Sequence, residues 1–168
     1  MIFDVEADGL LEDATKIHCM SFTKDGLPMC STSDYGAMRN ILLNQKVLIG
    51  HNIVRYDVPL LEKILGIKIK AKLYDTLPMS WVINTDRPKH NLDTFGEDFG
   101  VPKPEINDWV NLSQEEYIHR CQEDVKITQR LWENLIQRFM MVYKDKDNLD
   151  RFLQYLTFKM TNYKIKKK

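Results

Sequence analysis

The sequence predicts a single α/β domain in which a mixed β-sheet is flanked by α-helices. Three observations support this fold class. The first third of the chain has the residue pattern of β-strands, the middle alternates a short apolar run with helical segments, and the longest helical pattern comes late. Strands followed by alternating strands and helices are typical of a sheet covered by helices. With 168 residues, such a domain buries roughly two-thirds of its unfolded surface.

Three strands are expected at the N-terminus. Residues 2–6 alternate between apolar and polar, and residues 16–22 form a second run after a polar gap. Asp25-Gly26 is a turn signal that leads into residues 27–30. The simplest arrangement of these runs is a three-stranded antiparallel unit.

The middle of the chain predicts one buried strand and several helices. Residues 37–43 have a helical pattern, and the apolar run 47–50 predicts a buried strand. A helix is expected from Asp57, with Pro59 in its first turn and Gly66 at its end. Asp75 is expected to cap a helix that runs through residue 82, and 91–99 is a further short helix. Residues 102–111, with two prolines, predict a loop.

The longest helix has the clearest pattern. It begins at Ser113, which forms a capping box with Glu116, and apolar residues then recur at steps of three and four as far as Phe139. A second apolar segment covers residues 149–156, and residues 162–168 form a basic tail. We therefore expect a main domain over residues 1–140 and a C-terminal helical extension with a basic tail over 141–168.

Composition excludes several classes of protein. Lys+Arg and Asp+Glu both number 24, so the chain lacks the basic excess of proteins that wrap duplex DNA by bulk electrostatics. The three cysteines form no CxxC pair, which indicates free, partly buried thiols rather than a zinc site. Neither a signal peptide nor an apolar stretch of the ~18 residues needed to span a bilayer is visible. The expected location is the cytoplasm, with no membrane partner.

Acidic residues are the candidate functional groups. Asp4 and Glu6 are two apart in a strand, so they share a face, where they repel unless a cation lies between them. A divalent metal ion satisfies such a pair. Asp57 follows a buried strand and His51-Asn52, a position where ligands gather in α/β sheets. Asp124 lies at the edge of the apolar stripe of the long helix. Taken alone, these acids also fit an exposed strand end, a helix N-cap and a helix-edge residue.

Three ordered segments carry a resemblance to a known family. Residues 3–10, residues 50–57 with His51, Asn52 and Asp57, and residues 119–124 resemble the three exonuclease motifs of the DEDD (DnaQ-like) superfamily. Residues 75–77 and 90–96 support the match, which spans about residues 1 to 140. The chain is most similar to the proofreading exonuclease domain of phage family A DNA polymerases. The resemblance implies a ribonuclease H-like fold and a location in a bacterium or a phage-infected host cell.

The resemblance also implies a mechanism and its ligands. Two divalent metal ions, Mg²⁺ or Mn²⁺, would be held roughly 4 Å apart by Asp4, Glu6, Asp57 and Asp124, with Asp4 bridging both ions. The expected reaction is phosphodiester hydrolysis from the 3′ end of single-stranded DNA, in proofreading or as a separate exonuclease, with release of nucleoside 5′-monophosphates. Ala7, Leu10 and Asn52 match substrate-contacting positions, and a DNA polymerase is the expected protein partner.

The third motif departs from that branch of the family. The phage polymerase relatives carry a Tyr four positions before the last Asp, where this chain has Arg120. Five positions before Asp124 stands His119, as in the His-type (DEDDh) members, and a histidine is suited to accept a proton from the attacking water. In one unbroken helix, however, His119 points about 140° away from Asp124, whereas Arg120 shares its side. A catalytic His119 therefore requires a break in the helix, and otherwise it is a solvated residue.

Two other functions stay open at the level of sequence. The first is a 3′→5′ exoribonuclease of the same superfamily, because no motif here reads the 2′-hydroxyl group. The second is a non-catalytic, polymerase-associated binding module that keeps the fold. All four carboxylates are present, which favours an enzyme, and Arg120 is the feature that favours the binding module.

Overall fold

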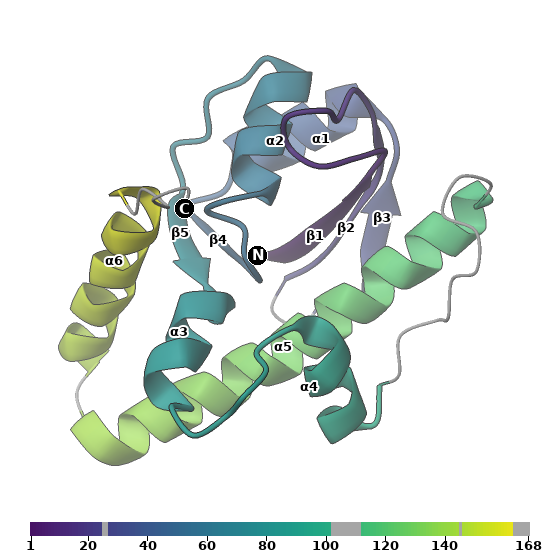
Figure 1. Cartoon of the computed structure of the whole chain (residues 1–168). Helices are drawn as coiled ribbons and strands as arrows, with labels where there is room; N and C mark the ends of the chain where they lie inside the picture. The colour runs from purple at the N-terminus through teal and green to yellow at the C-terminus, as the bar shows by residue number, and fades with distance from the viewer. Residues whose placement is uncertain (25–26, 102–111, 145, 163–168) are drawn as a thin grey trace, which may run out of the picture.

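The computed structural model describes residues 1–24, 27–101, 112–144 and 146–162. The expected loop at 102–111, which includes Trp109, and the basic residues 163–168 lie outside this range. Five strands form one mixed sheet in the order β3-β2-β1-β4-β5 (Figure 1). They are β1 (Ile2–Ala7), β2 (Ile17–Thr23), β3 (Cys30–Thr32), β4 (Val47–Gly50) and β5 (Lys72–Asp75).

The sheet combines the two arrangements that the sequence predicts. β1 pairs antiparallel with β2, and β2 pairs antiparallel with β3, which forms the expected N-terminal unit. β1 pairs parallel with β4, and β4 pairs parallel with β5. β5 has no counterpart among the predicted strands, since its four residues show no apolar run. The predicted fold class, a mixed sheet flanked by helices, is confirmed.

Within the described residues, six helices surround the sheet. They are α1 (Tyr35–Leu43), α2 (Asp57–Leu65), α3 (Thr76–Ile83), α4 (Leu92–Phe99), α5 (Gln114–Tyr143) and α6 (Lys146–Asn162). α5 packs along β1 and β2, whereas α6 lies beside β5 and α3 (Figure 1). None of the helices within the described residues has the length and apolar character that a membrane crossing requires.

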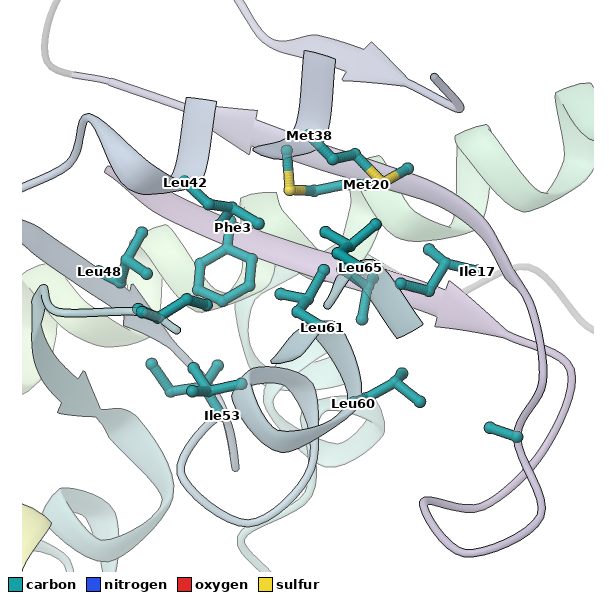
Figure 2. Packing of buried hydrophobic residues seen from close by; sticks show 14 residues of the cluster. Phe3, Ile17, Met20, Met38, Leu42, Leu48, Ile53, Leu60, Leu61 and Leu65 are labelled. Carbon is teal, nitrogen blue, oxygen red and sulfur yellow. The ribbon is translucent and has the colours of Figure 1, made fainter. Parts of the chain in front are cut away.

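The main hydrophobic core fixes the orientation of β1. Phe3 and Val5 are 0% and 5% exposed and pack among apolar residues of α1 and α2, including Met38, Leu42 and Leu61 (Figure 2). Because side chains alternate along a strand, burial of Phe3 and Val5 against α1 and α2 turns Asp4 and Glu6 to the opposite face. That face is covered by α5. The core thus determines which residues of β1 meet the long helix.

The helix boundaries follow the expected signals. Ser113 and Glu116 form the predicted capping box of α5, and Asp75 caps α3 by accepting a hydrogen bond from Leu77 N. Gly66 and Gly100 end α2 and α4 with a φ of 64°, a conformation in which glycine avoids a steric penalty. Asp57 is the first residue of α2 rather than its N-cap, which is Tyr56.

α5 continues past residue 140 to Tyr143, and α6 is anchored on the sheet. Tyr74 Oη on β5 donates a hydrogen bond of 2.5 Å to Asp150 Oδ1 on α6, and Thr157 Oγ1 donates one of 2.6 Å to Leu73 O. The helical extension is therefore packed against the edge of the sheet. The predicted division of the chain at residue 140 stays a prediction.

Candidate active site

Asp4, Glu6 and Asp124 form a compact group of carboxylates, called the acid cluster below. One ligand oxygen from each of the three lies within 4.8 Å of the other two. β1 supplies Asp4 and Glu6 from the face turned toward α5, and α5 supplies Asp124, which is 6% exposed. Three carboxylates at this separation repel one another in a partly buried site. Oxygen donors in such a group fit Mg²⁺ or Mn²⁺, the hard cations for which carboxylates are suited.

Asp57 lies beside the acid cluster, at the N-terminus of α2, but is not one of the three tightly grouped acids. Burial raises the pKa of Asp57 to about 8, and the charges of Asp75 and Glu6 act in the same direction. Hydrogen bonds from the backbone of Asp57 itself and of Val5 oppose this shift. A carboxyl group in this environment takes its charged form readily when a cation is added nearby. The three acids of the cluster therefore fit a divalent metal site, and Asp57 is close enough to Glu6 for their charges to interact.

Asp75 holds the segment that leads into Asp57. Its carboxylate is 2% exposed and accepts hydrogen bonds from Asn52 N at 2.8 Å, Val54 N at 3.1 Å and Leu77 N at 3.0 Å. Asn52 has a φ of 64°, which is uncommon for a residue other than glycine. Burial raises the pKa of Asp75 to about 6, and the three N–H groups oppose that shift. The sequence predicts Asp75 as a helix cap but gives no sign of its bonds to residues 52 and 54.

The loop after β1 is held in place by several polar contacts. Asp8 accepts hydrogen bonds from Thr15 Oγ1 at 2.6 Å and from the backbone N–H groups of Thr15 and Lys16. These bonds lower the pKa of Asp8 to about 2, and the bond from the Thr15 hydroxyl contributes most. Tyr56 Oη donates to Gly9 O at 2.6 Å, and Lys63 Nζ donates to three carbonyl groups of residues 11–14. The loop is thus tied to α2.

A cavity of about 540 Å³ opens next to Glu6, between this loop and α5. Ala7, Leu10 and Tyr56 line it, and the stacked rings of His18 and Tyr117, with centroids 3.9 Å apart, form another part of its wall. Leu10 is 75% exposed. Of the three expected substrate-contacting residues, Ala7 and Leu10 therefore line one cavity.

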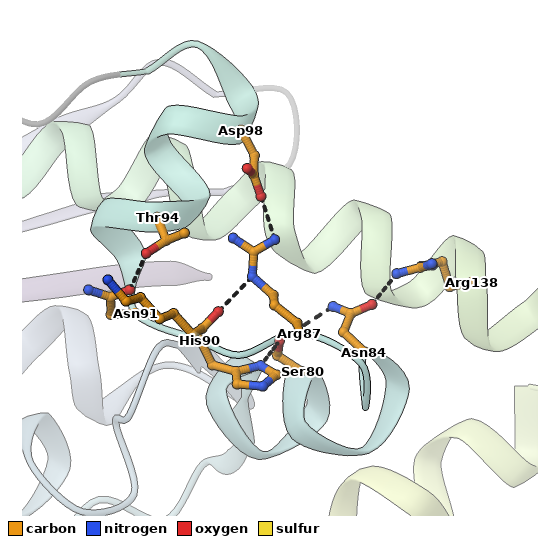
Figure 3. A network of polar contacts seen from close by, with 9 residues as sticks. Ser80, Asn84, Arg87, His90, Asn91, Thr94, Asp98 and Arg138 are labelled. Atoms are coloured by element: carbon orange, nitrogen blue, oxygen red, sulfur yellow. Dashed lines mark hydrogen bonds and ion pairs between the residues drawn. The ribbon is translucent and has the colours of Figure 1, made fainter.

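Asn52 lies at a second cavity, also of about 540 Å³, with His51, Trp81, His90 and Asn91. His90 shares a hydrogen bond of 2.7 Å with Ser80 Oγ and belongs to the polar network that joins α3, α4 and α5 (Figure 3). His18 thus stacks on Tyr117, and His90 contributes a hydrogen bond to the packing of α3. Phe95 is 3% exposed, and Arg87 Cζ lies 4.1 Å from the centroid of its ring.

The third motif brings Arg120, and not His119, to the acid cluster. α5 is continuous from Gln114 to Tyr143, so the helix break that a catalytic His119 requires is absent. The His119 side chain is 61% exposed, and its Nδ1 lies 3.9 Å from Glu123 Oε1. Arg120 is 15% exposed, and its Nε lies 3.0 Å from Glu6 Oε1. The structure therefore places His119 outside the site and gives no support to its role as a base.

Cys121 is a further contact of the site that the sequence did not single out. Its buried thiol donates to Asp4 O at 3.2 Å and lies 3.6 Å from Asp4 Oδ2. Burial is the main cause that raises the pKa of Cys121, so the thiol stays protonated. The period of the apolar stripe in α5 predicts that Cys121 is buried but cannot show which strand it meets. All three cysteines are free, as predicted.

Comparisons with known proteins agree with this description. No family model matches the chain. It is 24% identical over 186 aligned residues to the DNA-directed DNA polymerase of Escherichia phage T7, with 81% of the chain covered. The match spans 26% of the polymerase, about a quarter of its length.

Two solved nucleases share the fold. Brucella melitensis NrnC with bound Mg²⁺ superposes with a TM-score of 0.70 at 15% sequence identity, and the match covers 99% of this chain and 89% of that one. NrnC bound to pGG superposes with a TM-score of 0.70 at 17% sequence identity, and the match covers 99% of this chain and 88% of that one. Exonuclease X in complex with 5′ overhanging duplex DNA has a TM-score of 0.51 at 11% identity, covering 93% and 98%. The sequence similarity to the polymerase and the fold shared with these structures agree with the expected resemblance to DEDD-like exonucleases.

Proposed function

We propose that this chain is a metal-dependent 3′→5′ exonuclease that removes nucleoside 5′-monophosphates from the 3′ end of single-stranded DNA. The observation that carries the proposal is the acid cluster, in which β1 and α5 hold Asp4, Glu6 and Asp124 within 4.8 Å of one another. Asp57 completes the set of four acids from the N-terminus of α2. The similarity to the phage polymerase, to NrnC with bound Mg²⁺ and to exonuclease X in complex with DNA supports this proposal.

The four acids would hold two divalent ions, Mg²⁺ or Mn²⁺. Bound there, the ions would supply activation of a water molecule and stabilisation of charge on the phosphate and the leaving 3′ oxygen. Asp4 belongs to β1 together with Glu6 and shares the acid cluster with Asp124 on α5. The anchored loop 8–16 and the Asp75-bound segment 52–54 keep the acids in place from both sides.

The terminal nucleotide fits the cavity next to Glu6. Leu10 stands exposed at this cavity, where an apolar side chain packs against a base, and Ala7 leaves room for the sugar. Asn52 would contact the strand from the neighbouring cavity. An unpaired 3′ end suits these two separate hollows better than a duplex, because each base has to leave its stack to enter.

The direct test is digestion of oligonucleotides labelled at either end, with and without Mn²⁺. Stepwise shortening from the 3′ end and release of mononucleotides are expected for the wild type and not for Asp124→Asn. Glu123→Gln is the matched control, since Glu123 is a neighbouring buried acid that is paired with Lys126 at 2.6 Å outside the cluster. A wild-type protein that releases no nucleotide with either metal ion would refute the proposal.

A second candidate is an exoribonuclease of the same superfamily, supported by the fold shared with NrnC, which has been solved with bound pGG. Digestion of DNA and RNA of the same sequence in parallel separates the two substrates. The third candidate, a non-catalytic polymerase-associated module, is favoured by the ion pair between Arg120 and Glu6. It predicts that Asp124→Asn binds single-stranded DNA as the wild type does while neither protein cleaves it.

A further inference from the structure

Arg120 brings a positive charge into the acid cluster. Its guanidinium Nε lies 3.0 Å from Glu6 Oε1, and the side chains of Arg120 and Glu6 are 15% and 14% exposed. Glu6 is also one of the three acids whose oxygens lie within 4.8 Å of one another. The same carboxylate thus serves as the partner of a protein cation and as a candidate metal ligand.

The position of Arg120 on α5 directs its side chain toward the acid cluster. Arg120 stands four residues before Asp124, so the two share one side of the unbroken helix. Cys121 on the next position contacts Asp4 and fixes this turn of the helix against β1. His119 and Lys126 face Glu123, away from the cluster, at 3.9 Å and 2.6 Å.

We propose that Arg120 is a built-in counter-cation that competes with a divalent metal ion for Glu6, so that metal binding displaces the guanidinium. This inference rests on the proposed metal site. A metal ion bound to Glu6 Oε1 at about 2.1 Å would lie within about 5 Å of Arg120 Nε, because that nitrogen is 3.0 Å from the same oxygen. Two cations that close repel in a partly buried site. The metal ion and the guanidinium therefore each weaken the binding of the other to Glu6.

Competition has two consequences. Without metal, Arg120 neutralises part of the charge of the cluster and stabilises the fold. With metal, the free energy needed to displace Arg120 is subtracted from the metal affinity. Removal of the guanidinium should therefore weaken the metal-free fold and tighten metal binding, two effects of opposite sign.

The test measures Mn²⁺ binding to the full chain, without nucleic acid, by electron paramagnetic resonance of the free ion and by calorimetry. Arg120→Gln is expected to bind Mn²⁺ on the order of tenfold more tightly than the wild type, within the range usual for coupled binding. Arg120→Lys keeps the charge and should stay closer to the wild type. Arg151→Gln on α6 makes the same change in net charge at an exposed site and should leave the affinity unchanged.

Thermal unfolding provides a second measurement on the same proteins. Arg120→Gln should melt below the wild type without metal, and Mn²⁺ should raise its melting temperature by more than it raises that of the wild type. A purely structural Arg120 would lower both temperatures by similar amounts.

The outcomes separate this inference from the proposed function. If the wild type binds Mn²⁺, Asp124→Asn loses that binding, and Arg120→Gln binds equally or more weakly, the metal site stands and the competition is refuted. Arg120→Lys binding as tightly as Arg120→Gln also refutes it, because charge would then not be the cause. If neither the wild type nor Arg120→Gln binds Mn²⁺, both proposals fail.

Discussion

The acid cluster and Asp75 are two buried acidic regions of one sheet with opposite surroundings. Asp75, at the end of β5, is 2% exposed and accepts hydrogen bonds from three backbone N–H groups. In the acid cluster, Asp124 is 6% exposed and lies close to two other carboxylates, those of Asp4 and Glu6. Arg120 contributes the positive charge at Glu6.

The comparison shows that burial alone does not distinguish a functional acid from a structural one. Backbone N–H groups satisfy a carboxylate permanently, because they belong to the fold. Neighbouring carboxylates leave a site that favours an added cation. We therefore expect Asp75 to stabilise the folded protein. The acid cluster should instead bind metal and make the metal-free protein less stable.

The largest effect is expected for Asp124→Asn. Loss of residues that only support metal ligands commonly lowers activity by about 10- to 100-fold, so loss of a ligand should lower hydrolysis by about 100-fold or more. The same change removes one of three repelling charges, so the metal-free protein should be as stable as the wild type or more so. Both are measured on one preparation, by nucleotide release and by urea unfolding. A variant that is inactive because it is unfolded would contradict the division.

Asp75→Ala should produce the reverse pattern. It leaves three backbone N–H groups without their acceptor and removes the cap of α3, which together should lower the free energy of unfolding by about 2–3 kcal/mol. The matched control is Asp34→Ala, since Asp34 caps α1 through a single hydrogen bond to Ala37 N and is exposed. That control should cost about 1 kcal/mol. Equal losses in the two variants would show that the bonds to Asn52 and Val54 contribute nothing to stability.

Asp57 should make the stability of the metal-free protein depend on pH. Its pKa in the folded protein, raised to about 8 mainly by burial, lies above the value of 3.8 for an unperturbed Asp. Between these pH values the folded state binds more protons than the unfolded state, so stability falls as the pH rises. Asp75, with a pKa of about 6, adds to this slope in the lower part of the range only.

The informative interval is therefore pH 6.5 to 7.5, where the free energy of unfolding should fall by about 1 kcal/mol per pH unit in the absence of metal. Asp57→Asn should flatten that slope, and saturating Mn²⁺ should flatten it in the wild type, because a cation favours the charged form. Urea unfolding at the two pH values measures the slope. Stability that rises with pH in this interval, or a slope unchanged by Asp57→Asn, would contradict the assignment.

Much of the fold could be predicted because its signals are local. The capping box at Ser113, the cap at Asp75 and the glycine end at Gly66 each depend on a few adjacent residues and are confirmed. β5 could not be predicted, since this edge strand of four residues owes its conformation to pairing with β4 and not to an apolar pattern. Its residues Lys72 and Tyr74 instead contact Asp150 on α6.

The site could be predicted in part for a similar reason. Alternation along β1 puts Asp4 and Glu6 on one face, and helical spacing puts Arg120 on the side of Asp124. Which turn of α5 meets β1 depends on how the helix docks on the sheet, and no local rule gives that. The ion pair between Arg120 and Glu6 and the contact of Cys121 with Asp4 therefore required the structure.

The smallest effect is expected for His119→Ala, which tests whether His119 takes part in catalysis. His119 is 61% exposed and faces Glu123, and substitutions at such surface positions change stability by about 0.5 kcal/mol or less. Because the unbroken α5 directs the imidazole away from Asp124, we expect the rate of hydrolysis to stay within about threefold of the wild type, a change of less than ~1 kcal/mol in the barrier.

Single-turnover hydrolysis with Mn²⁺, measured from pH 5.5 to 8.5, provides the comparison. If His119 were the base, the variant would lose most of its rate throughout this pH range. That result would require α5 to break before Gln122 when substrate binds. His119, the residue before Arg120, would then belong to the active site.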